Sequence, residues 1–120
     1  MYSSKELALS VVKWAEAKKA KNPVVMDVST TSTFADYFVI CHASNKIQVV
    51  AIAEHIADQA EEIYQLPVYH KEGMSEGSWV LLDMNDVIVH IFDEETRELY
   101  NLEHLWHDSP RVELETETKQ

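Results

Sequence analysis

Glycine and cysteine are nearly absent from this sequence of 120 residues, which holds two glycines and one cysteine. Gly73 and Gly77 both fall within residues 72–78, so this stretch is the one place where we expect a flexible loop. Cys41 alone cannot form an intramolecular disulfide, and one thiol cannot supply the cysteine ligands of a zinc site. The chain is therefore expected to work in a reducing compartment such as the cytosol.

Basic residues are also scarce, with 10 Lys and Arg against 21 Asp and Glu and a formal net charge of −11. Lysines gather only within residues 13–21, at the end of a predicted helix, where the helix dipole already accounts for them. Proteins that grip nucleic acid normally neutralise phosphates with clustered Lys and Arg. No direct nucleic-acid grip is therefore expected, and a charged partner would be a basic protein.

Long apolar runs are missing as well. No run approaches the roughly 20 residues that span a membrane, and residues 1–6 lack the basic and apolar regions of a signal peptide. We expect a soluble, cytoplasmic protein with no membrane partner.

Apolar residues as a class are abundant, at 46 % of the chain. At this length they can form one core without help from a metal or a disulfide. Residues 107–120 contain more charged and fewer apolar side chains than the rest. The sequence therefore predicts a single domain over residues 1–106 and a charged, flexible C-terminal tail over residues 107–120.

Helices are predicted by capping signals followed by apolar residues at helical spacing. Ser3 with Glu6 begins a helix that should end near residue 20, before Asn22 and Pro23. Asn45 with Gln48 begins a second helix, which should end near residue 65. A further helical region is expected over residues 94–105, with a break near residue 101.

Strands are predicted where short apolar and β-branched runs lie between turn signals, at residues 24–28, 36–42, 68–71, 79–83 and 87–92. A short connector makes the first two antiparallel neighbours, and the helix between the second and third suggests a parallel crossover. The last two form a hairpin around residues 84–86. The fold class is therefore α/β, with a mixed sheet of about five strands packed by helices.

Metal and nucleophile chemistry has weak support among the His and Cys residues. His104 and His107 can share one helix face, but a zinc site needs three or four ligands at specific spacing. Cys41 and His42 are neighbours in a strand, so their side chains point to opposite faces and cannot meet. We expect no metal and no cofactor, a core position for Cys41, and surface or partner-facing histidines at 104 and 107.

Asp83 and Asp86 carry the alternative hypothesis, a magnesium-dependent nucleotidyltransferase-like enzyme, because two nearby carboxylates can hold magnesium. Such enzymes usually have a Gly-Ser phosphate-binding turn, and the only candidate, Gly77 with Ser78, opens no helix. Aspartates also flank hairpin turns for a simpler reason, since their side chains bond to local backbone. The simpler reading is favoured, and no catalytic residue is assigned.

Trp79 begins the strand over residues 79–83, in which side chains alternate between two faces. If Val80 and Leu82 pack on helices, Trp79 and Leu81 form an apolar patch with Asp83 at its rim. An aromatic centre with a charged rim is typical of a binding hot spot. Packing of Trp79 against a helix is an equally weighted alternative.

Several motifs, in order, resemble the RsfS/Iojap family of ribosomal silencing factors. The similarity covers roughly residues 4–106 and is carried by residues 34–41 (FADYFVIC), 50–56 (VAIAEHI), 72–73 (EG), 79–83 (WVLLD), 86–92 (DVIVHIF) and 97–106 (RELYNLEHLW). One departure follows Asp83, where the family often has an aromatic or apolar residue and then Gly. Here Met84 and Asn85 stand there, and Asn tolerates the left-handed conformation nearly as well as Gly.

This resemblance implies a fold and a function. The fold would be related to nucleotidyltransferases without their catalytic residues. The protein would be a non-enzymatic repressor of translation under nutrient limitation, which binds ribosomal protein L-fourteen of the large subunit and blocks joining of the ribosomal subunits. It also implies a homodimer, and it favours partner binding for the tryptophan motif. The candidate partner-binding residues are Trp79, Leu81, Asp83 and His90, with Lys71, Glu72 and Gly73 at the edge.

Overall fold

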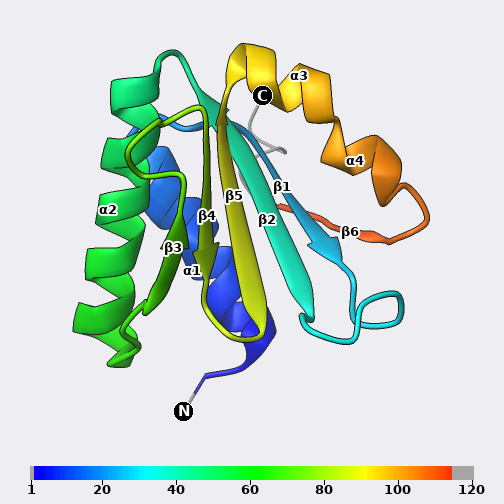
Figure 1. Ribbon diagram of the computed structural model, residues 1–120. Coiled ribbons are helices and arrows are strands. Elements are labelled where there is room, and N and C mark those ends of the chain that lie inside the picture. The colour runs from blue at the N-terminus through cyan, green and yellow to red at the C-terminus, as the bar shows by residue number, and fades with distance from the viewer. Residues whose placement is uncertain (1, 115–120) are drawn as a thin grey trace.

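A computed structural model describes residues 2–114, which form a six-stranded sheet and four helices (Figure 1). The helices are α1 (Ser4–Ala17), α2 (Lys46–Tyr64), α3 (Glu94–Tyr100) and α4 (Leu102–Leu105). The strands are β1 (Lys21–Asp27), β2 (Tyr37–Ala43), β3 (His70–Glu72), β4 (Trp79–Asp83), β5 (Val87–Asp93) and β6 (Arg111–Val112). The α/β class and the mixed sheet are confirmed, with one strand more than the sequence predicted.

The sheet has the strand order β3-β4-β5-β2-β1-β6. β5 and β2 pair in parallel at its centre, while β1 pairs with β2, and β4 with β5, in antiparallel fashion. β3 is antiparallel to β4 and so runs in the same direction as β2, as the strand–helix–strand pattern predicted. The crossover through α2 nevertheless passes two strands, because the β4–β5 hairpin returns to fill the space between β3 and β2.

The two faces of the sheet are covered unequally. α1 and α2 cover one face, and their apolar residues pack with the inward side chains of the sheet in one large core that includes Leu7, Val11, Ile52, Ile56 and Val89. The short helices α3 and α4 lie over one end of the opposite face (Figure 1). A second, smaller core lies there, around Phe38, Phe92 and Leu102. No other helix of residues 2–114 covers the rest of that face.

Local signals account for most element ends. Ser3 and Glu6 form the predicted capping box, and Asn45 accepts a hydrogen bond from the backbone N–H of Gln48. Asn101 takes the left-handed conformation, at φ 47°, and separates α3 from α4 as predicted. No helix within residues 2–114 combines the length and the apolar composition that crossing a membrane requires.

The C-terminal segment differs from the tail that the sequence predicted. Arg111 and Val112 pair with Met26 and Val25 of β1, and Leu114 is buried at 3 % exposure in the large core. The sequence does not predict β6, because a strand of two residues shows no alternation of buried and exposed side chains. Residues 115–120 of the predicted tail lie outside the described part of the chain.

Candidate functional site

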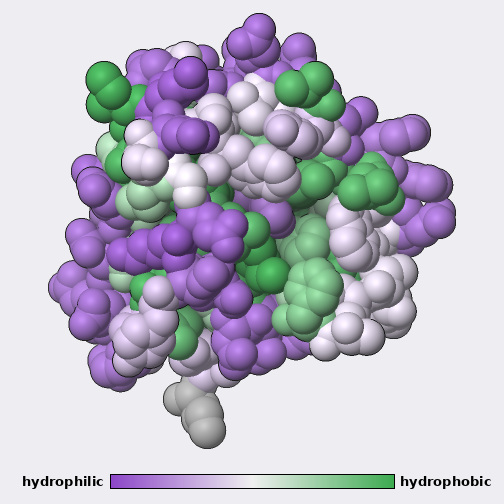
Figure 2. Space-filling view, in the orientation of Figure 1, coloured by the Kyte–Doolittle hydropathy of each residue, from purple (hydrophilic) through white to green (hydrophobic). Residues whose placement is uncertain are grey.

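The candidate site is the part of the sheet that α1 and α2 do not cover. Val80 and Leu82 are fully buried on the helical side, as the alternation predicted, so Trp79, Leu81 and Asp83 point to the other side. We call this surface the open face and define it by five half-buried or exposed residues: Glu72, Trp79, Leu81, Asp83 and Tyr100. Figure 2 shows hydrophobic and near-neutral surface gathered between β3 and helices α3 and α4, with hydrophilic surface beside it.

Trp79 packs against a helix, which was one of the two alternatives that the sequence left open; partner binding by Trp79 stays a prediction. Its ring lies 4.7 Å from that of Tyr100 on α3 and 5.1 Å from that of Phe92 on β5, measured between centroids. The ring is nonetheless only half-buried, so part of it stays available to a partner. Contacts between aromatic rings at such distances stabilise a fixed orientation. The tryptophan is therefore a half-buried aromatic group whose orientation is supported by its neighbours.

His90 does not lie on the surface with Trp79 and Leu81. It pairs with Leu81 across β4 and β5, but only 6 % of it is exposed. The indole Nε1–H of Trp79 donates to His90 Nδ1 over 3.1 Å, and the Phe38 ring meets the imidazole edge-on at 5.0 Å. His90 Nε2 is buried without a partner in the described part of the chain. His90 therefore supports the open face from beneath instead of contacting solvent.

Burial lowers the pKa of His90 to about 4, from its usual 6.5, because a charged imidazole would lose its water here. Between pH 6.5 and 4 the unfolded chain then binds a proton that the folded chain does not, so stability falls as the pH falls. We expect the titration of His90 to lower the unfolding free energy by about 2 to 3 kcal/mol when the pH falls from 7 to 4.5.

Urea unfolding at the two pH values measures this loss. His90→Leu serves as the reference, because it keeps every other titrating group. The loss of unfolding free energy between the two pH values should be smaller in the variant by about 2 to 3 kcal/mol. Equal losses in both chains would show that His90 does not have a lowered pKa.

Three residues at the β3 edge have different positions. Glu72 pairs with Leu81 and so lies on the open face. Lys71 pairs with Leu82, whose side chain points to the helical side, so alternation places Lys71 on the other face. Gly73 has φ 83°, and a Cβ there would run into the carbonyl oxygen of Trp79. The structure thus brings Glu72 to the patch, keeps Lys71 away from it, and gives Gly73 the role of letting the loop pass close behind Trp79.

Asp83 and Asp86 are arranged as turn residues. Asp83 Oδ1 accepts from the backbone N–H of Asn85 over 3.0 Å, and Asn85 takes the left-handed conformation, at φ 73°. Asp86 is exposed, and its carbonyl oxygen accepts from the backbone of Asp36 and Tyr37. Within residues 2–114 no three His, Cys, Asp or Glu side chains come together as a metal-binding group. The simpler reading of the two aspartates is thus supported by a specific bond.

Cys41 and His42 lie on opposite faces, as predicted. Cys41 is fully buried in the large core, and this burial raises the pKa of its thiol to about 12. An unexposed thiol with a raised pKa is neither a nucleophile nor a ready metal ligand. His42 lies on the same side of the sheet as Phe92, its neighbour on β5.

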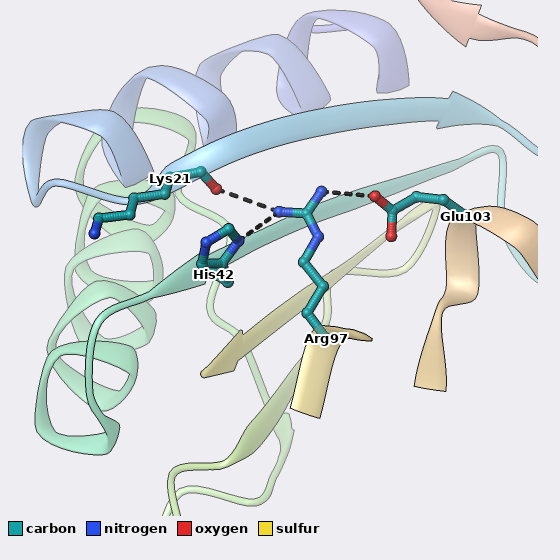
Figure 3. A network of polar contacts seen from close by, with 4 residues as sticks. All are labelled: Lys21, His42, Arg97 and Glu103. Atoms are coloured by element: carbon teal, nitrogen blue, oxygen red, sulfur yellow. Dashed lines mark hydrogen bonds and ion pairs between the residues drawn. The ribbon is translucent and has the colours of Figure 1, made fainter. Parts of the chain in front are cut away.

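His42 belongs to a buried polar network centred on Arg97 of α3 (Figure 3). Arg97 Nη1 lies 2.8 Å from His42 Nδ1 and 3.3 Å from the backbone oxygen of Lys21, and Nη2 lies 2.8 Å from Glu103 Oε2. Burial, followed by the Arg97 charge, lowers the pKa of His42. Burial alone would raise the pKa of Glu103, but the bond and charge of Arg97 outweigh it and hold that pKa below its usual value.

This network ties α3 and α4 to the sheet. Arg97 is on α3, Glu103 on α4, and Lys21 and His42 on the two strands below. Tyr100, whose ring contacts that of Trp79, follows Arg97 by about one helical turn. The network therefore fixes the position of α3, and with it the position of Tyr100 at the edge of the open face. A hollow of about 370 Å³ beside it is lined by both signs of charge, including Arg97, Arg111, Glu94, Glu98 and Glu103.

Sequence reasoning did not find Tyr100 or Arg97 as site residues. Helical spacing predicted the segment that carries them, but nothing local shows which side of a short helix meets a sheet. A single arginine among acidic neighbours was the available signal, since Arg97 lies between Glu94, Glu95 and Glu98 in the chain.

Comparison with known protein families gives a match over nearly the whole chain. A family model described as "Ribosomal silencing factor during starvation" (RsfS) matches residues 2–120. A ribosomal silencing factor from Bacillus subtilis is 44 % identical over 110 residues, which cover 88 % of this chain and 92 % of the relative. A chloroplastic Iojap protein from Zea mays is 32 % identical over 112 residues, covering 93 % of this chain and 48 % of the relative.

Solved structures agree with these matches. A crystal structure from Bacillus halodurans is 38 % identical, has a TM-score of 0.80, and is matched over 92 % of this chain and 99 % of its own. A protein from Chromobacterium violaceum has a TM-score of 0.85 at 24 % identity, over 95 % of this chain and 93 % of its own. The second of these shows a shared fold, while the first shares sequence as well.

Proposed function

The chain belongs to the RsfS family of ribosomal silencing factors, and from this membership we propose that it binds the large ribosomal subunit through ribosomal protein L-fourteen. Bound there, it blocks joining with the small subunit and represses translation when nutrients are limiting. In this role the protein works by occupying a surface and needs no catalytic group or cofactor.

The observation that carries this proposal is the open face with Trp79 at its centre. A half-buried tryptophan held by Tyr100 and Phe92 is a preorganised anchor, which loses little freedom on binding. Glu72 and Asp83 supply carboxylates on the same surface, and the chain as a whole carries a net charge of −11. Such a surface favours a basic protein over nucleic acid, because complementary charge steers association and phosphates would be repelled.

In the part of the chain that the structure describes, no observation favours the enzymatic alternative. Nucleotidyl transfer would need carboxylates free to hold magnesium, whereas Asp83 accepts the backbone N–H of Asn85 in the hairpin turn. Gly77 and Ser78 lead directly into β4 and not into a helix, so they offer no helix N-terminus for a phosphate.

A factor that acts on ribosomes would work in the cytoplasm, where the subunits meet.

A homodimer is compatible with the same surface. Two copies that pair through their open faces would hide Trp79 from solvent, and the ribosomal partner would then compete with the second copy. Sedimentation of the free protein, followed by titration with L-fourteen, tests this. A dimer that remains intact while L-fourteen is bound would show that the two contacts use separate surfaces.

A subunit-joining assay tests the function directly. Purified small and large subunits are mixed with increasing amounts of the protein, and joined ribosomes are separated from free subunits on a sucrose gradient. We expect joined ribosomes to decrease in proportion to the protein bound, and free large subunits to carry the protein. If joining proceeds normally on large subunits that the protein saturates, the proposed mechanism is wrong.

A further inference from the structure

The bond between Trp79 and His90 has a defined direction. Indole Nε1–H can only donate, so His90 Nδ1, 3.1 Å away, must be the acceptor. A neutral imidazole with an unprotonated Nδ1 carries its proton on Nε2. That Nε2–H is buried with no partner in residues 2–114. His90 therefore offers Trp79 one acceptor, at the expense of a donor that stays unpaired.

The buried, unpaired Nε2–H distinguishes His90 from an ordinary core residue, which would bury no unpaired polar atom. The neighbours of His90 are aromatic rings, with Phe38 at 5.0 Å, Trp79 at 5.9 Å and Phe92 at 6.3 Å between centroids. A leucine would fill such a place without burying an unpaired polar atom, and stability alone would favour it. What the imidazole adds is the acceptor for the indole N–H.

We propose that His90 is a positioning residue for the partner contact: it holds the indole N–H of Trp79, so that the tryptophan meets its partner with the exposed ring alone. The inference rests on the proposed function, because it concerns the same open face. His90 itself, at 6 % exposure, makes no contact with the partner.

This arrangement specifies the chemistry of the partner group at Trp79. With its single N–H already bonded, the indole has no hydrogen bond left to donate. The face of an aromatic ring attracts apolar side chains and cations, and the cationic contact is stronger with tryptophan than with other aromatic residues. Glu72 and Asp83 lie on the same face and favour a positive group. The partner should therefore place a lysine or arginine, through its aliphatic stem or its charge, against the tryptophan.

Two substitutions separate positioning from mere packing. In His90→Asn the amide oxygen stands as many bonds from Cα as Nδ1 does in histidine, so an acceptor for the indole is kept. In His90→Leu the volume is kept and the acceptor is lost. The indole ¹⁵N–¹H resonance of Trp79, identified through Trp79→Phe, reports the bond in the free protein. We expect its exchange with solvent to be slow in the original chain and in His90→Asn, and faster in His90→Leu.

Affinity for purified large subunits supplies the second measurement. Freeing one immobilised aromatic side chain should weaken binding by roughly two- to tenfold in His90→Leu, with His90→Asn restoring most of it. In a Trp79→Ala background the same His90→Leu change should alter affinity by less than about twofold, since the group that it positions is gone. A merely structural histidine would change the melting temperature but leave the affinity of the folded protein unaltered.

The outcomes separate this inference from the function that it rests on. If Trp79→Ala weakens binding but His90→Leu does not, the positioning role is wrong and the docking face stands. If Trp79→Ala binds as tightly as the original chain, the docking face is wrong and the positioning role falls with it. If the indole N–H exchanges equally slowly in His90→Leu, the hydrogen bond does not hold the ring and the inference is overturned.

Discussion

Trp79→Ala should weaken binding to the large ribosomal subunit by roughly thirtyfold or more while leaving the chain folded. Removing a central aromatic anchor commonly costs about 2 kcal/mol of binding free energy or more. The fold should survive because the side chain is only half-buried and lies at the margin of the smaller core, away from the large core under α1 and α2. Co-sedimentation of the variant with purified large subunits, over a range of concentrations, measures the loss.

Ile47→Ala is the matched control. Ile47 is the most exposed large aliphatic residue of α2, at 84 %, and it lies on a helix that covers the opposite side of the sheet. The Ile47→Ala variant should bind large subunits as tightly as the original chain does.

A second variant of the open face, Leu81→Ser, should weaken binding without removing the aromatic ring. Retained binding in both Trp79→Ala and Leu81→Ser, with circular dichroism showing native folds, would exclude the open face as the docking surface.

Arg97→Met should lower the unfolding free energy by about 3 kcal/mol and the melting temperature by roughly 10 °C. The guanidinium side chain is 9 % exposed and its Glu103 partner 19 %, so the substitution leaves a carboxylate with little water and no cation in contact. His42 and the Lys21 carbonyl lose their partner at the same time. Thermal unfolding at pH 7, followed by circular dichroism, measures the change.

Arg111→Met is the control for charge alone. Arg111 lines the same hollow and also lowers the pKa of Glu103, but it is exposed and, within residues 2–114, its side chain makes no hydrogen bond or ion pair with the network. Its replacement should change stability by no more than about 0.5 kcal/mol. Equal melting temperatures for the two variants would show that the buried bonds of Arg97 contribute nothing beyond net charge. Because Tyr100 stands on the helix that Arg97 anchors, Arg97→Met should also loosen the wall beside Trp79.

The helices and the central hairpin could be predicted because their signals are local. Ser3 with Glu6 and Asn101 with its left-handed conformation mark ends that depend on a few neighbouring residues. The tight turn through Asn85 also follows from local chemistry. β6 could not be predicted, because two residues become a strand only through pairing with β1, which lies at the other end of the chain.

The candidate site divides in the same way. Alternation along β4 was enough to place Trp79, Leu81 and Asp83 together on one face. The same reasoning could not place His90 or Lys71, because burial of the first and the side taken by the second depend on strand order and register. The family resemblance favoured only the tryptophan motif, and the prediction extended it to His90 and Lys71 because these residues stand close to that motif in the chain.

The order of residues along the chain is enough to establish an acidic α/β domain with one glycine loop, a β4–β5 hairpin and a tryptophan on a strand face. Periodicity and capping are properties of neighbouring residues, so they can be read without the fold. Packing decides whether that strand face is covered. Only because the crossover through α2 passes two strands, and because Arg97 fastens α3 and α4 at one end, does Trp79 stand half-exposed with His90 beneath it.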